Sequence, residues 1–103
     1  MKSARKLPYV VYKLTFPNGK IYVGMDIGAG GHSLRYFGSW DTLSVEADFS
    51  IDELRDFSVR KQILFESWDA GEVRRMESDW IVKLNASDPS VGYNRTHRRK
   101  LKS

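Results

Sequence analysis

Residues 9–24 read Tyr-Val-Val-Tyr-Lys-Leu-Thr-Phe-Pro-Asn-Gly-Lys-Ile-Tyr-Val-Gly, and this stretch decides the fold. Two runs rich in β-branched and aromatic residues flank Pro17-Asn18-Gly19, a combination typical of a β-hairpin. Proline has the φ that the second position of a type I turn requires, and Gly19 can adopt a positive φ. The sequence therefore predicts a hairpin closed by a three-residue loop, in which Phe16 pairs with Lys20.

The length of this loop determines which side chains share a face, because side chains alternate along a strand. A two-residue turn would place Tyr12 and Tyr22 on opposite faces. A three-residue loop pairs Tyr12 with Gly24 and Leu14 with Tyr22, so both tyrosines lie on one face. We favour this register because Pro17 fits a turn better than a ladder position. Two phenols with a glycine between them leave room for a ligand; the alternative is that they are ordinary amphipathic strand residues.

Composition sets bounds on the class of protein. The length of 103 residues suits a single domain spanning 1–103 with one core. There is no apolar run long enough to cross a membrane and no signal-peptide pattern, so we expect a cytoplasmic protein without membrane contact. With no cysteine and two histidines, thiolate and all-histidine metal sites are excluded. Any metal would be held mainly by carboxylates, which favours Mg²⁺.

The net charge of +4 is distributed unevenly along the chain. Both ends are basic, whereas the middle, residues 40–80, is acidic. Basic ends suit a polyanion such as nucleic acid, whose phosphates attract Lys and Arg. The alternative is that residues 1–8 and 95–103 are only solubilising tails, and we expect both to be flexible.

The remaining segments are assigned from capping and periodicity. We expect loops at 25–32, which is glycine-rich, and at 41–49. Ser50-Ile-Asp-Glu53 matches a capping box, which predicts a short helix over 51–57 with Leu54 and Phe57 inward. Residues 58–66 alternate and predict a third strand in which Val59, Lys61, Ile63 and Phe65 share one face.

A second capping-box pattern, Asp69-Ala-Gly-Glu72, precedes the strongest helical signal. Its apolar stripe consists of Val73, Met76, Trp80, Ile81 and Leu84. Glu77 falls inside this stripe, so its carboxylate should point toward the sheet. A buried carboxylate without a partner costs several kcal/mol or takes up a proton. The alternatives to a functional role are an ion pair with a nearby arginine and a stripe edge that reaches solvent.

Four segments together resemble the GIY-YIG nuclease family. Val10-Val11-Tyr12 and Tyr22-Val23-Gly24 resemble its two triplets, although Val10 replaces the first glycine and valines replace both isoleucines. Arg75-Met-Glu77-Ser-Asp-Trp80-Ile is similar to the family's metal-binding helix. Gly92-Tyr93-Asn94 is similar to its closing motif.

This resemblance implies an α/β (α+β) fold with a small, mostly antiparallel three-stranded sheet flanked by helices. It implies a Mg²⁺-dependent DNA endonuclease, with Mn²⁺ as a possible replacement metal. Tyr12 would be the general base, helped by Tyr22, and Arg35 would bind the scissile phosphate. Glu77 would bind the metal, and Asn94 would steady its surroundings. Should Arg35 be only a surface residue, the alternative arginines are Arg55 and Arg60.

A free phenol has a pKa near ~10, so a base role for Tyr12 requires the metal, Arg35 or Lys20 to favour the phenolate. The predicted DNA contacts are Lys20, His32, Arg95, Arg98, Arg99 and Lys100. The chain is similar to small phage, homing or mobile-element nucleases, which predicts a bacterial or phage-infected host cell. Specificity would come from a homodimer or a partner protein. The competing functions are a catalytically inactive nucleic-acid-binding module of the same fold and a protein-interaction domain that uses the acidic middle.

Overall fold

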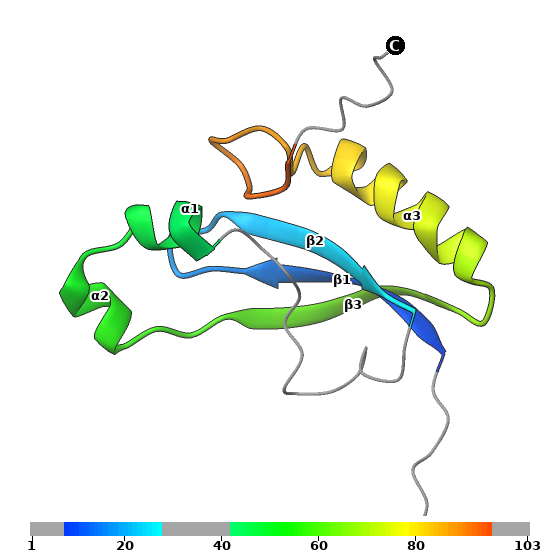
Figure 1. The fold of residues 1–103 in the computed structure, drawn as a ribbon, viewed down its shortest axis with the longest axis horizontal. Coiled ribbons are helices and arrows are strands. Elements are labelled where there is room, and N and C mark those ends of the chain that lie inside the picture. The colour runs from blue at the N-terminus through cyan, green and yellow to red at the C-terminus, as the bar shows by residue number, and fades with distance from the viewer. Residues whose placement is uncertain (1–7, 28–41, 96–103) are drawn as a thin grey trace, which may run out of the picture.

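The computed structural model describes residues 8–27 and 42–95. Its three strands form one antiparallel sheet in the order β2-β1-β3, and a C-terminal helix packs against it (Figure 1). This confirms the predicted α+β class and the three-stranded antiparallel sheet. In chain order the elements are β1 (Tyr9–Thr15), β2 (Ile21–Asp26), α1 (Thr42–Ala47), α2 (Ile51–Arg55), β3 (Arg60–Ser67) and α3 (Ala70–Lys83).

The hairpin closes with the predicted three-residue loop. The Phe16 backbone N–H donates to the Lys20 carbonyl at 2.9 Å, and the Gly19 N–H donates to the Phe16 carbonyl at 2.8 Å. Gly19 adopts a φ of 89°, in the region that favours glycine. The resulting register pairs Tyr12 with Gly24, which confirms the favoured alignment of β1 and β2.

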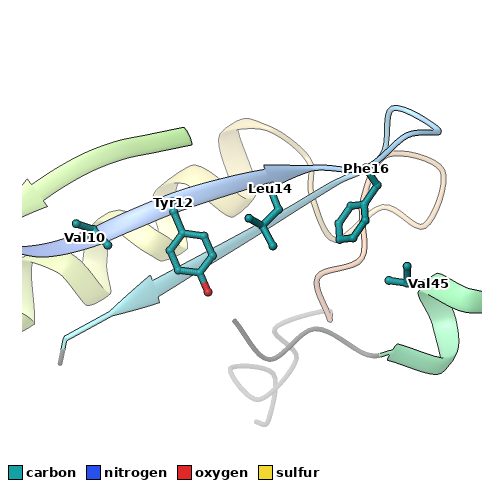
Figure 2. Close-up of a cluster of buried hydrophobic side chains, with 5 residues drawn as sticks. All are labelled: Val10, Tyr12, Leu14, Phe16 and Val45. Carbon is teal, nitrogen blue, oxygen red and sulfur yellow. The ribbon is translucent and has the colours of Figure 1, made fainter. Parts of the chain in front are cut away.

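The register divides the sheet into two faces. On the first, Val10, Tyr12 and Leu14 of β1 and Phe16 just after it are buried in one cluster with Val45 of α1. Figure 2 shows Tyr12, Leu14 and Phe16 extending to the same side of the strand, with Val45 near Phe16. Tyr22 packs against the same cluster. We call this the tyrosine face.

The opposite face is covered by α3, and we call it the helix face. Its buried residues are Val11, Val23, Val73, Ile81 and Ala86. Met76 and Trp80 of α3 and its C-cap residue Leu84 pack against this cluster. The predicted apolar stripe of α3 is therefore confirmed. Through this stripe the amphipathic helix packs against one face of the sheet.

A β-bulge alters the predicted alternation of β3. Val11 pairs with Phe65 and Tyr12 pairs with Ile63, so Leu64 is the extra residue. An extra residue reverses the alternation beyond it. Phe65 consequently packs with the helix-face cluster, while Ile63 packs with the tyrosine-face cluster. The expectation that Ile63 and Phe65 share a face is wrong for this reason.

The helix α1 corrects the prediction of a loop over 41–49. Its six residues bury one side chain, Val45, against the tyrosine-face cluster. One buried residue makes no periodic pattern, so tertiary packing rather than a sequence period defines this helix.

The predicted capping box of α2 is confirmed. Ser50 Oγ accepts from the Glu53 backbone N–H at 3.1 Å, and Glu53 Oε1 accepts from the Ser50 N–H at 2.7 Å. The helix ends at Arg55, two residues before the predicted end. Leu54 is 37% exposed rather than inward, whereas Phe57 packs edge-on against Phe49 with ring centroids 4.9 Å apart.

The cap of α3 is simpler than predicted. Asp69 Oδ1 accepts from the Gly71 N–H at 2.9 Å, as an N-cap does. Glu72 Oε1 instead accepts from the Ser67 hydroxyl at 2.6 Å, so the reciprocal capping box is not formed. The hydroxyl of Ser67 thereby ties the end of β3 to the first turn of α3.

Two expectations concern segments at the edges of the described part. β2 continues to Asp26, so Met25 and Asp26 belong to a strand and not to the predicted loop over 25–32. Residues 1–7, 28–41 and 96–103 lie outside the described residues, and most of the predicted basic tails lies there. Within 8–27 and 42–95, no helix has the length and apolarity needed to cross a bilayer.

The closest packing in the sheet is between Tyr12 and Gly24, and it yields a prediction. A Cβ added at Gly24 would lie 2.5 Å from Tyr12 Oη and 2.6 Å from its Cζ. Gly24→Ala should therefore lower the free energy of unfolding by about 1–3 kcal/mol through overpacking. Urea denaturation of Gly24→Ala in the wild-type and Tyr12→Leu backgrounds measures this. Because leucine removes the clashing atoms, the cost should shrink in the second background; an equal cost in both would contradict the packing.

Candidate functional site

The two tyrosines of the predicted site occupy the same face, as expected. Tyr12 is 1% exposed and Tyr22 is half-buried. The predicted room for a ligand above Gly24 is not found, because the phenol of Tyr12 itself fills that space.

Lys61 joins Tyr12 on this face, and the sequence reasoning did not identify it as a site residue. It pairs with Leu14 across β1 and β3, and its Nζ lies 5.0 Å from the centroid of the Tyr12 ring. Burial lowers the pKa of Lys61, while the charge of Asp26 raises it. The alternation of residues 58–66 predicts that Lys61 shares a face with Ile63, and this is the feature of the sequence that indicates its position.

Lys20 lies beside Asp48 and Tyr93, not beside Tyr12, whose phenolate it was one of the groups expected to favour. Its Nζ is 2.9 Å from Asp48 Oδ2 and 5.3 Å from the centroid of the Tyr93 ring. The Tyr93 hydroxyl donates to the same Asp48 oxygen at 2.6 Å and accepts from Asn18 Nδ2 at 3.0 Å. The ammonium group is thus engaged with Asp48 and Tyr93 rather than with Tyr12.

The electrostatics of this cluster follow from its hydrogen bonds. Desolvation, together with the Asp48 carboxylate as acceptor, raises the pKa of Tyr93 to about 12. Hydrogen bonds from Tyr93 and Lys20 lower the pKa of Asp48. At neutral pH the phenol is therefore a fixed donor, and the carboxylate is a fixed acceptor between α1 and the C-terminal segment.

A pocket of about 420 Å³ lies beside this cluster, between α1, the hairpin turn and residues 87–95. Two of the predicted DNA contacts, Lys20 and Arg95, line it together. Two positive side chains in the lining of one pocket suit a phosphate group. The polar lining side chains include Lys20, Ser44, Asp48, Ser87, Tyr93 and Arg95.

Glu77 lies on α3, which covers the helix face. Burial raises the pKa of its carboxyl group, and no described residue gives it a hydrogen bond or an ion pair. The alternative to a functional role, an ion pair with a nearby arginine, is thus not found among the described residues. Tyr12 and α3 thus occupy opposite faces of the sheet, and α3 contacts all three strands.

The donor set can be compared with the metal that the resemblance implies. Within the described ranges no group of three or more His, Asp or Glu side chains converges on one point. Mg²⁺ needs no such cage, because it usually keeps several waters and binds one or two carboxylates together with substrate phosphates. The half-buried carboxylate of Glu77, which has no ion-pair partner among the described residues, fits that requirement. Glu77 therefore suits the role of a magnesium ligand.

Asn94 has a backbone role that sequence reasoning did not predict. Its Oδ1 accepts from the Val23 N–H and its Nδ2 donates to the Val23 carbonyl, each at 2.8 Å. Val23 lies between Tyr22 and Gly24 on the edge strand. The amide therefore holds the second triplet in place, and no hydrogen bond joins it to Glu77 in the described part of the chain.

Arg35, the predicted phosphate-binding arginine, lies outside the described residues, as do His32, Arg98, Arg99 and Lys100. Of the two alternatives, Arg55 pairs with Asp52 at 2.7 Å on α2. Arg60 is exposed at the beginning of β3, opposite Thr15 in the register.

Comparison of this chain with protein-family models, with curated proteins and with solved structures found no match. Functional inference consequently depends on the chain's own residues and their geometry. The strongest elements are the tyrosine pair on one face, the half-buried carboxylate of Glu77 and the clamp from Asn94 to Val23.

The clamp yields a prediction that does not depend on activity. Asn94→Ala removes two hydrogen bonds from partly buried backbone groups, so the free energy of unfolding should fall by about 1–3 kcal/mol. Amide hydrogen exchange should show loss of protection at Val23 first, because Val23 N–H loses its acceptor. Asn85→Gly is the matched control, because Asn85 is exposed after α3 and its φ of 59° suits glycine. Unchanged exchange at Val23 in Asn94→Ala would contradict the clamp.

Proposed function

We propose that the chain is a metal-dependent DNA endonuclease of the GIY-YIG type, with the corresponding nuclease-like fold. The observation that carries this proposal is the register that puts Tyr12 and Tyr22 on one face with Gly24 under the phenol. The half-buried Glu77 and the position of Asn94 beside the second triplet support it. The host would be a bacterial or phage-infected cell, with the protein in its cytoplasm.

The proposed reaction is hydrolysis of a phosphodiester bond. Tyr12, as phenolate, accepts a proton from a water molecule whose oxygen bonds to phosphorus, and the bond from phosphorus to the leaving oxygen breaks. Tyr22 assists from the same face, and Arg35 binds the non-bridging oxygens. Glu77 would hold Mg²⁺ or Mn²⁺, which when bound supplies Lewis-acid stabilisation of charge on the phosphate and the leaving oxygen.

The proposed DNA contacts begin at the pocket between the hairpin turn and α1. Arg95 is exposed there, while Lys20 is shared with Asp48. Arg95 therefore offers the less compensated charge, and it leads directly into the basic segment with Arg98, Arg99 and Lys100. A chain of this size would read sequence loosely, so a second copy or a partner protein would supply specificity.

One observation favours the second candidate, a nucleic-acid-binding module without turnover. Tyr12 is 1% exposed, and a general base must contact water or a bound substrate. Val10 also stands at the position of the first glycine in the resemblance. Normal DNA affinity without cleavage in Mg²⁺ or Mn²⁺ would support the module over the enzyme.

The first prediction concerns Glu77. Glu77→Gln preserves the shape of the side chain but removes its charge, so plasmid nicking in Mg²⁺ should be abolished. Because the wild-type carboxylate is desolvated, urea stability should be unchanged or slightly higher in Glu77→Gln. Electrophoretic mobility shift should show that DNA binding is largely retained.

Asp79→Asn on the same helix is the matched control for Glu77→Gln. Asp79 is exposed, so its substitution should leave nicking at the wild-type level. EDTA should stop nicking by the wild type and by the control. Nicking by Glu77→Gln at the wild-type rate would contradict the metal assignment.

The second prediction concerns Arg95. Arg95→Ala should weaken binding to unrelated DNA sequences alike and reduce the slope of log K against log salt by about 0.9, one phosphate contact. Fluorescence anisotropy over a salt series measures both quantities. Arg55→Ala is the control, because its guanidinium is already paired with Asp52. An unchanged salt slope in Arg95→Ala would show that this side chain does not contact phosphate.

A further inference from the structure

The tyrosine face carries a cation that the resemblance does not assign. Lys61 reaches Tyr12 from β3, and its Nζ lies 5.0 Å from the ring centroid, within the range of a cation–π contact. The register of the sheet defines this position, because Lys61 pairs with Leu14, the next residue of β1 on the same face. The bulge at Leu64 lies beyond it, so Lys61 keeps the alternation that Phe65 loses.

The charge balance around Tyr12 can be stated for the described residues. Lys61 comes from β3, Tyr22 and Asp26 come from β2, and Tyr93 packs edge-on against Phe16. Burial lowers the pKa of Lys61, and Asp26 opposes that effect. An ammonium group that is partly withdrawn from water gains from a nearby negative charge.

Ionisation of Tyr12 would supply that negative charge. A phenolate distributes its charge over the oxygen and the ring, so a cation above the ring attracts the phenolate more strongly than the phenol. Lys20 cannot serve here, because it is bound to Asp48 and lies over Tyr93. Lys61 is therefore the described cation nearest to the proposed base.

We propose that the Lys61 ammonium stabilises the phenolate of Tyr12 and so makes this tyrosine a usable base. This inference rests on the proposed nuclease function for its purpose, but its electrostatic content stands alone. Lys61 acts through Tyr12, as a positioning and charge-stabilising residue. Tyr12 first releases its proton to solvent and then takes one proton from the attacking water, so the phenol is restored and no further reactant is needed.

The test is a direct titration of Tyr12 without DNA or metal. NMR of protein labelled with ¹³Cζ-tyrosine follows each phenol, and Tyr12→Phe assigns its signal. In Lys61→Met the pKa of Tyr12 should rise by about one pH unit, whereas Lys61→Arg should stay close to the wild type. Lys61→Gln is the second variant, to be used if methionine at this position prevents folding by circular dichroism.

Lys20→Met is the matched control, since Lys20 lies over the Tyr93 ring as Lys61 lies over that of Tyr12. It should change the titration of Tyr93 and leave that of Tyr12 unchanged. An unchanged or lower pKa of Tyr12 in both Lys61→Met and Lys61→Gln would overturn the proposal.

The same variants separate this inference from the proposed function. Where the wild type nicks plasmid, the pH at which nicking reaches half its maximal rate should be higher in Lys61→Met, and higher pH should restore the rate. A purely structural role of Lys61 would lower the rate without moving the profile. Absence of nicking by the wild type would overturn the nuclease proposal, while the NMR titration would still decide the role of Lys61.

Discussion

The turn at Pro17-Asn18-Gly19 is the constraint on which the rest of the structure depends. Its three residues align Tyr12 with Gly24, and that alignment puts Tyr12 and Tyr22 on the tyrosine face. A loop shorter by one residue would place Tyr12 and Tyr22 on opposite faces of the sheet. The tyrosine pair and the tight packing on Gly24 follow from this turn, whereas the contact with Lys61 follows from the pairing of β1 with β3.

Local patterns in the sequence were sufficient for the hairpin, the third strand and α3, because each has either turn chemistry or a clear period. They were insufficient for α1, where a single buried residue, Val45, replaces a period. They also failed at Leu64, because the bulge arises from the pairing of β3 with β1 and cannot be recognised in the sequence of β3 alone. Contacts distant in sequence decide such features.

The site was predictable to a different extent for each residue. The shared face of Tyr12 and Tyr22 followed from loop length, and the inward position of Glu77 followed from the stripe of α3. The clamp of Asn94 on Val23 spans 71 residues, so no local pattern contains it. The contact of Lys61 with Tyr12 could not be predicted for a related reason. It depends on which residues of β1 pair with β3, and the sequence of β3 alone does not contain that information.

The edge of β2 links these features into one arrangement. Ile21 donates to the Val91 carbonyl, Tyr93 donates to the Ile21 carbonyl, and Asn94 satisfies both backbone groups of Val23. These bonds protect the first half of an edge strand that would otherwise pair with another chain. They also place residues 91–95 along this edge of the sheet, beside Ile21 and Val23. Because the Tyr93 ring packs edge-on against Phe16 and its hydroxyl donates to Asp48, the same segment also contacts the tyrosine face and the residue that follows α1. The C-terminal segment therefore holds the edge strand and the tyrosine-face cluster together.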